Sequence, residues 1–178
     1  LIDFRCHFHR YPELSGAEVQ TAQRVVSYLR PLAPSRIWDN IGGAGVVALF
    51  DSGHAGPCLL LRAELDALPI QEVNDFAYRS PYPGVAHKCG HDGHTAILLG
   101  VAAALQQRAL QHGKLLLLFQ PAEETGAGAS AMQGARKTLS SWKAGCRQAG
   151  HRPRRRGPHT QVRGSLIFQT MGGRPMCD

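Results

Sequence analysis

The sequence predicts an α/β fold, in which helices pack against a sheet of buried strands. Residues 58–61 and 114–119 are short aliphatic runs without polar and apolar alternation, which is typical of strands covered on both faces. An Ala- and Leu-rich segment of helical period, residues 92–111, lies between them. Strand, helix and strand in this order form the repeating unit of α/β sheets, so we expect a site at the carboxyl edge of the sheet.

The first helix is expected within residues 12–32, where apolar residues recur at helical spacing and Pro31 ends the run. Ser15 and Glu18 fit a capping box at its start. Residues 45–50 form an apolar, β-branched run that predicts a strand. We expect this strand to pair directly with the strand at residues 58–64.

The second helix is expected over residues 92–111, with Asp92 as its N-cap and Gly113 as its C-terminal stop. The strand at residues 114–120 follows it. Residues 165–171 could form one more short strand, but it stands alone in the sequence.

Charge divides the chain into two parts. Residues 1–135 hold 10 Lys/Arg and 12 Asp/Glu, a net charge of −2, whereas residues 136–178 hold 10 Lys/Arg and a single acid, a net charge of +9. The first part is an ordinary domain by charge, so we predict no nucleic-acid partner for it. The second part has no sustained period, and we interpret it as a poorly patterned tail, truncated or frame-shifted. A tail that binds RNA is the alternative.

The cysteines and the apolar runs bear on the compartment. Five scattered cysteines argue against a disulfide scaffold and for a reducing environment. The apolar runs fall far short of the roughly 20 residues that a membrane span requires. No secretory signal is visible at the start of the sequence. We therefore expect a cytoplasmic protein without a membrane partner.

The stretch HKCGHDGHT, residues 87–95, gathers side chains that bind metals. Cys89 and His91 lie on either side of Gly90, just before the second helix, so a turning backbone can aim both at one point. A thiolate and an imidazole together favour Zn²⁺ or another first-row metal. The alternative is a polar loop that precedes a helix, because two ligands alone do not hold a metal.

Carboxylates follow both buried strands. Glu123 and Glu124 come directly after one strand, where burial of an uncompensated carboxylate costs several kcal/mol unless a cation neutralises it. Glu64 and Asp66 end the other strand on the same side of an extended chain, where they could orient histidine ligands. A solvated acidic pair and surface acids are the alternatives.

Together, HRYPELSGAE, GVVALF, GPCLLLRAELDALPI, HKCGHDGHT and LLLLFQPAEE resemble one branch of a metallopeptidase family. This amidohydrolase branch contains hippurate hydrolase, auxin-conjugate (IAA-amino acid) hydrolases, N-acetyldiaminopimelate deacetylase, and related aminoacylases and carboxypeptidases. The resemblance covers residues 1 to about 134. It implies the N-terminal part of a three-layer α/β/α zinc-peptidase-like catalytic domain with a mixed sheet. We expect the lid and dimerisation domain of that family, and the closing strands of its catalytic domain, to be missing here, which would leave an unpaired sheet edge and favour aggregation.

The resemblance also implies roles for single residues. Cys89, His91 and Glu124 would be metal ligands, with Cys89 bridging two divalent ions, which are Zn, Mn, Co or Ni. Glu123 would be the general base, with Asp66 as a second catalytic candidate. His9 would be structural. Four further side chains would lie behind the ligands or face the substrate: Glu64, His87, Asp92 and His94.

Function follows from these implied roles as an expectation. The resemblance implies a metal-dependent hydrolase that cleaves the amide bond of N-acyl amino acids or small peptides, and a dimer in the complete family. The family supplies further histidine ligands downstream, but neither His151 nor His159 stands in a matching context. The alternative is therefore a non-catalytic, degenerate fragment with weak or no metal binding.

Overall fold

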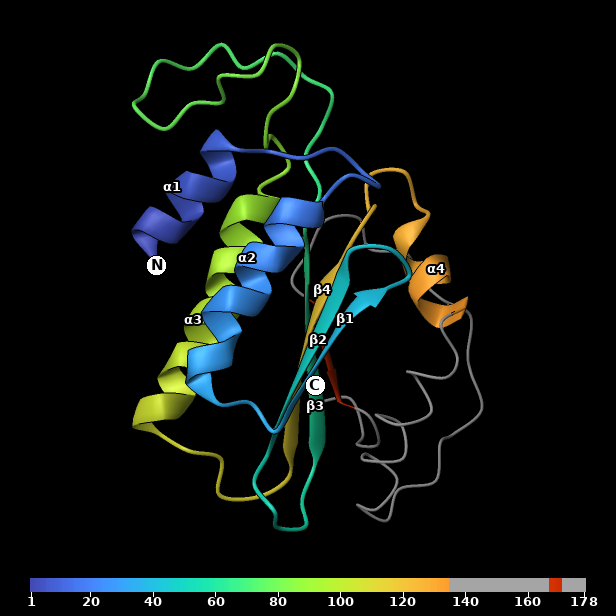
Figure 1. The fold of residues 1–178 in the computed structure, drawn as a ribbon. Coiled ribbons are helices and arrows are strands. Elements are labelled where there is room, and N and C mark those ends of the chain that lie inside the picture. The colour runs from blue at the N-terminus through green and yellow to red at the C-terminus, as the bar shows by residue number, and fades with distance from the viewer. Residues whose placement is uncertain (135–166, 171–178) are drawn as a thin grey trace, which may run out of the picture.

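The computed structural model describes residues 1–134 and 167–170, which form a mixed sheet with helices against it (Figure 1). The elements are α1 (Ile2–Arg10), α2 (Val19–Leu29), the 3-10 helix η1 (Arg30–Leu32), β1 (Arg36–Ile41), β2 (Gly45–Asp51), β3 (Cys58–Glu64), α3 (His91–Gln107), β4 (Lys114–Gln120), α4 (Gly128–Gly134) and β5 (Ile167–Thr170). The predicted α/β class and mixed sheet are confirmed. The sequence patterns did not predict α1, β1 or α4.

The strand order is β1-β2-β4-β3-β5, so β4 lies between β2 and β3. The prediction that β2 and β3 pair directly is therefore wrong. β4 is parallel to β3, to which α3 connects it, and antiparallel to β2. Leu116, Leu117 and Phe119 of β4 are fully buried, and an interior position in the sheet is the one that covers both faces of such a strand.

Helices α2 and α3 cover one face of the sheet, α1 packs against α3 on the same side, and α4 lies on the other face (Figure 1). The larger core lies between the sheet and these three helices, and its fully buried side chains include Val25, Leu29, Val46, Leu98, Leu99, Leu117 and Phe119. Met132 of α4 packs with Val47, Leu60 and Leu116 on the opposite face. Among the described helices, none has the length and apolar character that a membrane span requires.

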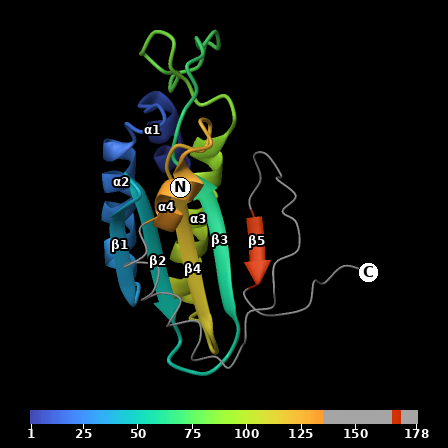
Figure 2. The same cartoon turned by 90° about the vertical axis from the view of Figure 1, so that its right-hand side faces the viewer.

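Strand β5 pairs antiparallel with β3 along one edge of the sheet (Figure 2). The pairing covers Leu59 to Arg62 of β3. The expectation that this short strand stands alone is therefore wrong. The rest of the predicted tail, with His151 and His159, lies outside the described residues.

The start of α2 does not use the predicted capping box. The helix begins at Val19, and its N-cap, Glu18, makes no side-chain capping bond. Instead the carboxylate of Glu13 accepts hydrogen bonds from the backbone N–H groups of Gln20 (3.2 Å) and Thr21 (2.7 Å). The motif Ser-x-x-Glu is present, but both of its side chains have partners far away in the sequence, as described below.

The start of α3 also differs from its prediction. The N-cap is Gly90, whose φ of +101° is readily accessible only to glycine, and Asp92 makes no capping bond. The helix ends at Gln107, earlier than predicted, so Gly113 does not terminate it. Gly113 has a φ of +76° in the loop before β4, where an added Cβ would lie 2.1 Å from the carbonyl oxygen of Pro57.

Candidate metal centre

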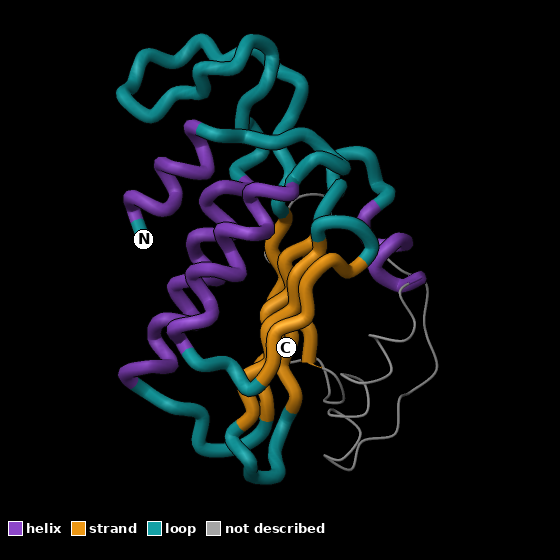
Figure 3. The backbone as a smooth tube through the Cα atoms, viewed as in Figure 1, coloured by secondary structure: helices purple, strands orange, loops and turns teal. Residues whose placement is uncertain are grey.

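The candidate site lies where the parallel strands β3 and β4 end and α3 begins (Figure 3). Glu64 is the last residue of β3, and His91 is the first residue of α3. Glu123 and Glu124 lie in the loop that follows β4. We call residues 89–91 the ligand turn and residues 121–128 the acidic loop.

Cys89, His91 and Glu124 each offer one donor atom, and these three atoms lie within 4.8 Å of one another. His91 Nε2 is 3.8 Å from Glu124 Oε1 and 3.8 Å from Glu123 Oε2. Within the described part of the chain, both His91 Nε2 and Glu124 Oε1 are buried without a hydrogen-bond partner. Buried polar atoms rarely remain unpaired, and sulfur, nitrogen and carboxylate oxygen form a suitable donor set for Zn²⁺ and related ions. The side chains present therefore fit a divalent metal.

Asp66 holds the imidazole of His91 from behind. His91 Nδ1 lies 2.8 Å from the backbone oxygen of Asp66 and 3.3 Å from its Oδ1, so Nδ1 carries the hydrogen and Nε2 faces the other donors. Burial lowers the pKa of His91, but the bonds to Asp66 and the charge of Glu64 outweigh burial and raise the pKa to about 9.

Asp66 also joins this turn to two other segments. Its Oδ2 accepts hydrogen bonds from Ser15 Oγ (2.7 Å) and from the backbone N–H of Glu124 (2.8 Å). Burial raises the pKa of Asp66, but the bonds from His91, Glu124 and Ser15 together lower it below its ordinary value. One buried carboxylate thus fixes the ligand turn and the acidic loop relative to each other.

Cys89 is an exposed, free thiol at the mouth of the site. Partial loss of contact with water and the neighbouring carboxylate of Glu124 both disfavour the thiolate, and they raise the pKa of the Cys89 thiol to about 11. Near neutral pH the metal-free site therefore holds one proton on Cys89 and a second on His91. A cation bound by both residues must displace these two protons.

The acidic loop is fixed through its backbone. Ala122 adopts a left-handed conformation (φ +48°), and its N–H donates to Glu18 Oε1 at 2.6 Å. A Cβ added to Gly128 would lie only 1.6 Å from the carbonyl oxygen of Pro121, so the loop closes on itself where only glycine fits. Burial and the charge of Glu124 raise the pKa of Glu123, although the charge of His91 opposes them.

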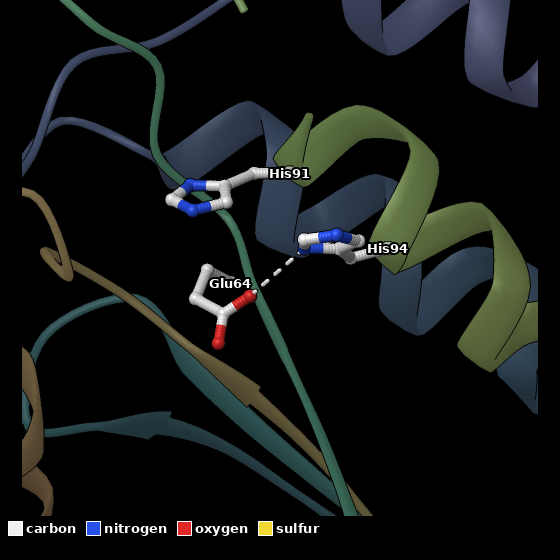
Figure 4. Close-up of side chains that lie close together, drawn as sticks. All are labelled: Glu64, His91 and His94. Carbon is white, nitrogen blue, oxygen red and sulfur yellow. Dashed lines mark hydrogen bonds and ion pairs between the residues drawn. The ribbon is translucent and has the colours of Figure 1, made fainter. Parts of the chain in front are cut away.

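A second group of possible ligands lies beside the first. Atoms of Glu64, His91 and His94 lie within 4.8 Å of one another (Figure 4). Glu64 is fully buried and ion-paired with Arg62 at 2.9 Å, and its Oε2 lies 3.4 Å from His94 Nδ1. The carboxylate thus lies between a guanidinium and an imidazole that is partly exposed.

His87 and Asp92 lie elsewhere. Asp92 is buried and bonds to His9 and Arg5 of α1. His87 is 5% exposed, and both of its ring nitrogens lack a hydrogen-bond partner among the described residues. Burial lowers the pKa of His87 to about 4, so its imidazole is neutral.

Several side chains that build the site have no motif of their own in the sequence. Ser15 and Glu18 looked like local caps, and Arg62 looked like a strand residue. A structural role was expected for His9, but its two buried partners, the carboxylates of Glu72 and Asp92, were not identified from the sequence. The polar string HRYPELS was the available signal, because so many polar residues next to a helix need partners.

Residues 60–161 match the model of peptidase family M20/M25/M40, a range that continues into the predicted tail. The chain is 46% identical over 132 residues to N-acetyl-L-cysteine deacetylase of Bacillus subtilis, covering 73% of this chain and 31% of the relative. It is 43% identical over 139 residues to IAA-amino acid hydrolase ILR1-like 5 of Arabidopsis thaliana, covering 72% of this chain and 29% of the relative. The chain thus spans about a third of the length of these curated relatives.

The fold has a counterpart among solved structures. The structure of the Bacillus subtilis YXEP protein, described as a dinuclear metal-binding peptidase of the M20 family, superposes with a TM-score of 0.70 at 39% identity. The superposition covers 75% of this chain and 38% of that one. The family match, the fold and the order of the motifs agree: the chain belongs to peptidase family M20/M25/M40.

Proposed function

We propose that this chain is part of a metal-dependent amidohydrolase that cleaves the amide bond of N-acyl amino acids or small peptides. One observation carries the proposal: Cys89, His91 and Glu124 converge, and two of their donor atoms are buried and unpaired in the part of the chain described. Two relatives, a deacetylase of N-acetyl-L-cysteine and a hydrolase of IAA-amino acids, support an N-acyl amino acid as substrate.

In this proposal Cys89, His91 and Glu124 hold a divalent metal, and Glu64 with His94 lies close enough to His91 to contribute to a second ion. A bound ion would supply Lewis acidity to water and to the amide carbonyl. Asp66 is the residue that orients His91, because its own oxygens are engaged by His91, Ser15 and the acidic loop. We therefore assign it positioning rather than proton transfer.

Glu123 is the proposed general base. Its Oε2 is 3.8 Å from His91 Nε2, beside the donor atoms, and its raised pKa brings it closer to the pH at which a base works well. Glu123 would take a proton from the water whose oxygen attacks the amide carbon. It would then pass that proton to the leaving nitrogen as the C–N bond breaks, giving a carboxylic acid and a free amine.

The experiment uses the purified chain, its Glu123→Gln variant, and N-acetyl amino acids as substrates. We expect the variant to bind Zn²⁺ as the unaltered chain does, and to lose hydrolysis by about 10²-fold or more. Binding is measured by metal analysis, and hydrolysis by release of free amine. Hydrolysis at an unchanged rate in the variant would show that Glu123 is not the base.

The rival hypothesis, a non-catalytic chain, draws on the short span of about a third of the relatives' length. The same assays separate the two hypotheses. Metal binding together with hydrolysis supports the amidohydrolase, whereas metal binding without hydrolysis supports the rival for this chain. A chain that binds no metal would contradict the metal centre itself.

A further inference from the structure

The ligand turn is flanked by two charged residues, and both are tied to one buried histidine. Lys88 precedes the turn and donates to Glu72 Oε1 at 2.5 Å. Asp92 follows the turn, and its Oδ2 lies 2.9 Å from His9 Nδ1. His9 Nε2 lies 3.2 Å from both oxygens of Glu72. The contacts therefore close a ring, which we call the charge ring: Lys88, Glu72, His9 and Asp92.

His9 is the buried side chain that links the two carboxylates of the charge ring. It is only 4% exposed, and Glu72 and Asp92 are 7% and 2% exposed. Each ring nitrogen lies within hydrogen-bond distance of a different buried carboxylate, so the imidazole bridges Glu72 and Asp92. Removal of His9 would take away the side chain that contacts both carboxylates, while Glu72 would keep its bonds to Lys88 and Ser80, and Asp92 its bond to Arg5.

The ring is anchored outside the turn. Glu72 Oε2 accepts the backbone N–H of Ser80 at 2.8 Å, and Arg5 Nε donates to Asp92 at 3.1 Å. These bonds tie the ring to helix α1 and to the long loop between β3 and α3. Burial raises the pKa of Glu72, but the bonds from Lys88, Ser80 and His9 lower it to about 2, so this carboxylate stays charged.

The turn itself needs an external constraint. Its middle residue is Gly90, at a φ of +101°, and glycine has the widest choice of backbone conformations. Asp66 holds the imidazole of His91, but Cys89 is exposed and lies at the open side of the turn. The two residues next to the turn are the ones that the charge ring holds.

We propose that His9 is a positioning residue, and that the charge ring holds Cys89 and His91 at the separation that a shared metal ion requires. The inference rests on the proposed metal-binding function. Nothing in the ring touches the donor atoms, so its effect is on the geometry of the ligands. The ring closes across the sequence, since His9 lies 83 residues from Asp92 and 63 from Glu72.

The test compares His9→Gln with His7→Gln in the full 178-residue chain. His7 lies on the same helix, is half-buried and packs its ring against that of Tyr11, outside the charge ring, so it is a matched control. Two quantities are measured. One is the affinity for Co²⁺, together with the sulfur-to-cobalt absorbance per bound ion, which reports Cys89. The other is amide hydrogen exchange of residues 86–95 without metal.

We expect His9→Gln to weaken Co²⁺ binding by about tenfold or more, the size typical when a residue that orients ligands is lost. The sulfur-to-cobalt absorbance per bound ion should fall, and exchange in residues 86–95 should accelerate. His7→Gln should change none of the three. A merely structural role for His9 would lower the global stability of the chain but leave the absorbance per bound ion unchanged.

Lys88→Met is a second variant that breaks the charge ring by removing the ion pair with Glu72. It keeps the proposal testable if His9→Gln fails to fold. The Lys88 side chain is 25% exposed, so the expected effects have the same direction and smaller size. Unchanged Co²⁺ absorbance and unchanged exchange in a folded variant would overturn the proposal. If the unaltered chain binds no Co²⁺, the proposed metal function fails, and the exchange of residues 86–95 still decides whether the ring holds the turn.

Discussion

The ligand turn and the acidic loop bring donors to the same point, yet they are held in different ways. The ligand turn is flexible at Gly90 and is fixed by charged side chains on both sides. The acidic loop is fixed by its own backbone, through the left-handed Ala122 and the close approach of Gly128 to Pro121. Carboxylates bond to both segments, because Glu18 and Asp66 accept N–H groups of the acidic loop, but only the acidic loop is also closed sterically. These two halves of the site should therefore respond to different perturbations.

Gly128→Ala should break the acidic loop, and we expect the largest effect from it. The added methyl would lie 1.6 Å from the carbonyl oxygen of Pro121, so the backbone has to move and carry Glu123 and Glu124 with it. We expect a loss of about 3 kcal/mol in the free energy of unfolding, measured with urea, and loss of metal binding.

Gly134→Ala is the matched control for that change. Gly134 ends the same helix, α4, and an added Cβ there meets nothing within 4 Å. Its free energy of unfolding and metal affinity should stay close to those of the unaltered chain. A Gly128→Ala chain that is equally stable would show that the loop is not sterically closed.

The affinity of the ligand turn for metal should depend on pH. His91, with a pKa of about 9, and Cys89, with a pKa of about 11, are both protonated near neutrality without metal. Metal binding must release both protons, so the affinity for Co²⁺ should rise with pH, by about hundredfold per pH unit below pH ~9. Above the pKa of His91 only the Cys89 proton remains to be displaced, and the slope should fall to about tenfold per unit.

Titration with Co²⁺ at several pH values between about 6.5 and 8.5 measures this slope. A Cys89→Ser variant sharpens the comparison, because it removes one of the two displaced protons and should halve the slope on a logarithmic scale. An affinity that does not depend on pH would mean that the ligand turn does not supply these donors.

Asp66→Asn tests the contact that joins the two halves, and we expect the smallest of the three effects. The variant weakens the hold on His91 Nδ1 and on the backbone of Glu124 together. Metal affinity should fall by about tenfold, as measured by competition with a chelator. Asp51→Asn is the control, because Asp51 pairs with Lys114 at the far end of the sheet. Equal affinity in both variants would mean that Asp66 does not couple the two halves.

The elements that local patterns predicted best are the apolar strands β2, β3 and β4 and the long helix α3. The continuous apolar runs of the strands and the helical period of α3 indicate which faces are covered, and this needs no knowledge of the partner. The family resemblance implied that Cys89, His91 and Glu124 are ligands of one centre, and the structure places their donor atoms close together.

Partners far apart in the sequence could not be predicted. Ser15 and Glu18 satisfy a local capping pattern, but Ser15 donates to Asp66, and Glu18 accepts the N–H of Ala122, 104 residues away. Asp92 fits an N-cap by position, yet His9 and Arg5 bind it. In each case a charged or hydroxyl group that is wholly or partly buried bonds to a residue far away in the sequence instead of to its local backbone. A local sequence pattern shows that a side chain could cap a helix, but it does not show which distant groups compete for the same side chain.

The place of β4 between β2 and β3 has a consequence for how the molecule is assembled. Residues 45–64 contain two strands that follow each other in the sequence but do not pair. In the sheet β4 lies between them, so β2 and β3 cannot take their final positions before β4 is in place. Glu64 and Glu123 acquire their relative position only when residues 114–120 have entered that gap. Pairing over such sequence separations is generally slow, so we expect the central pairing of the sheet and the cluster of donor atoms to form together, late in folding.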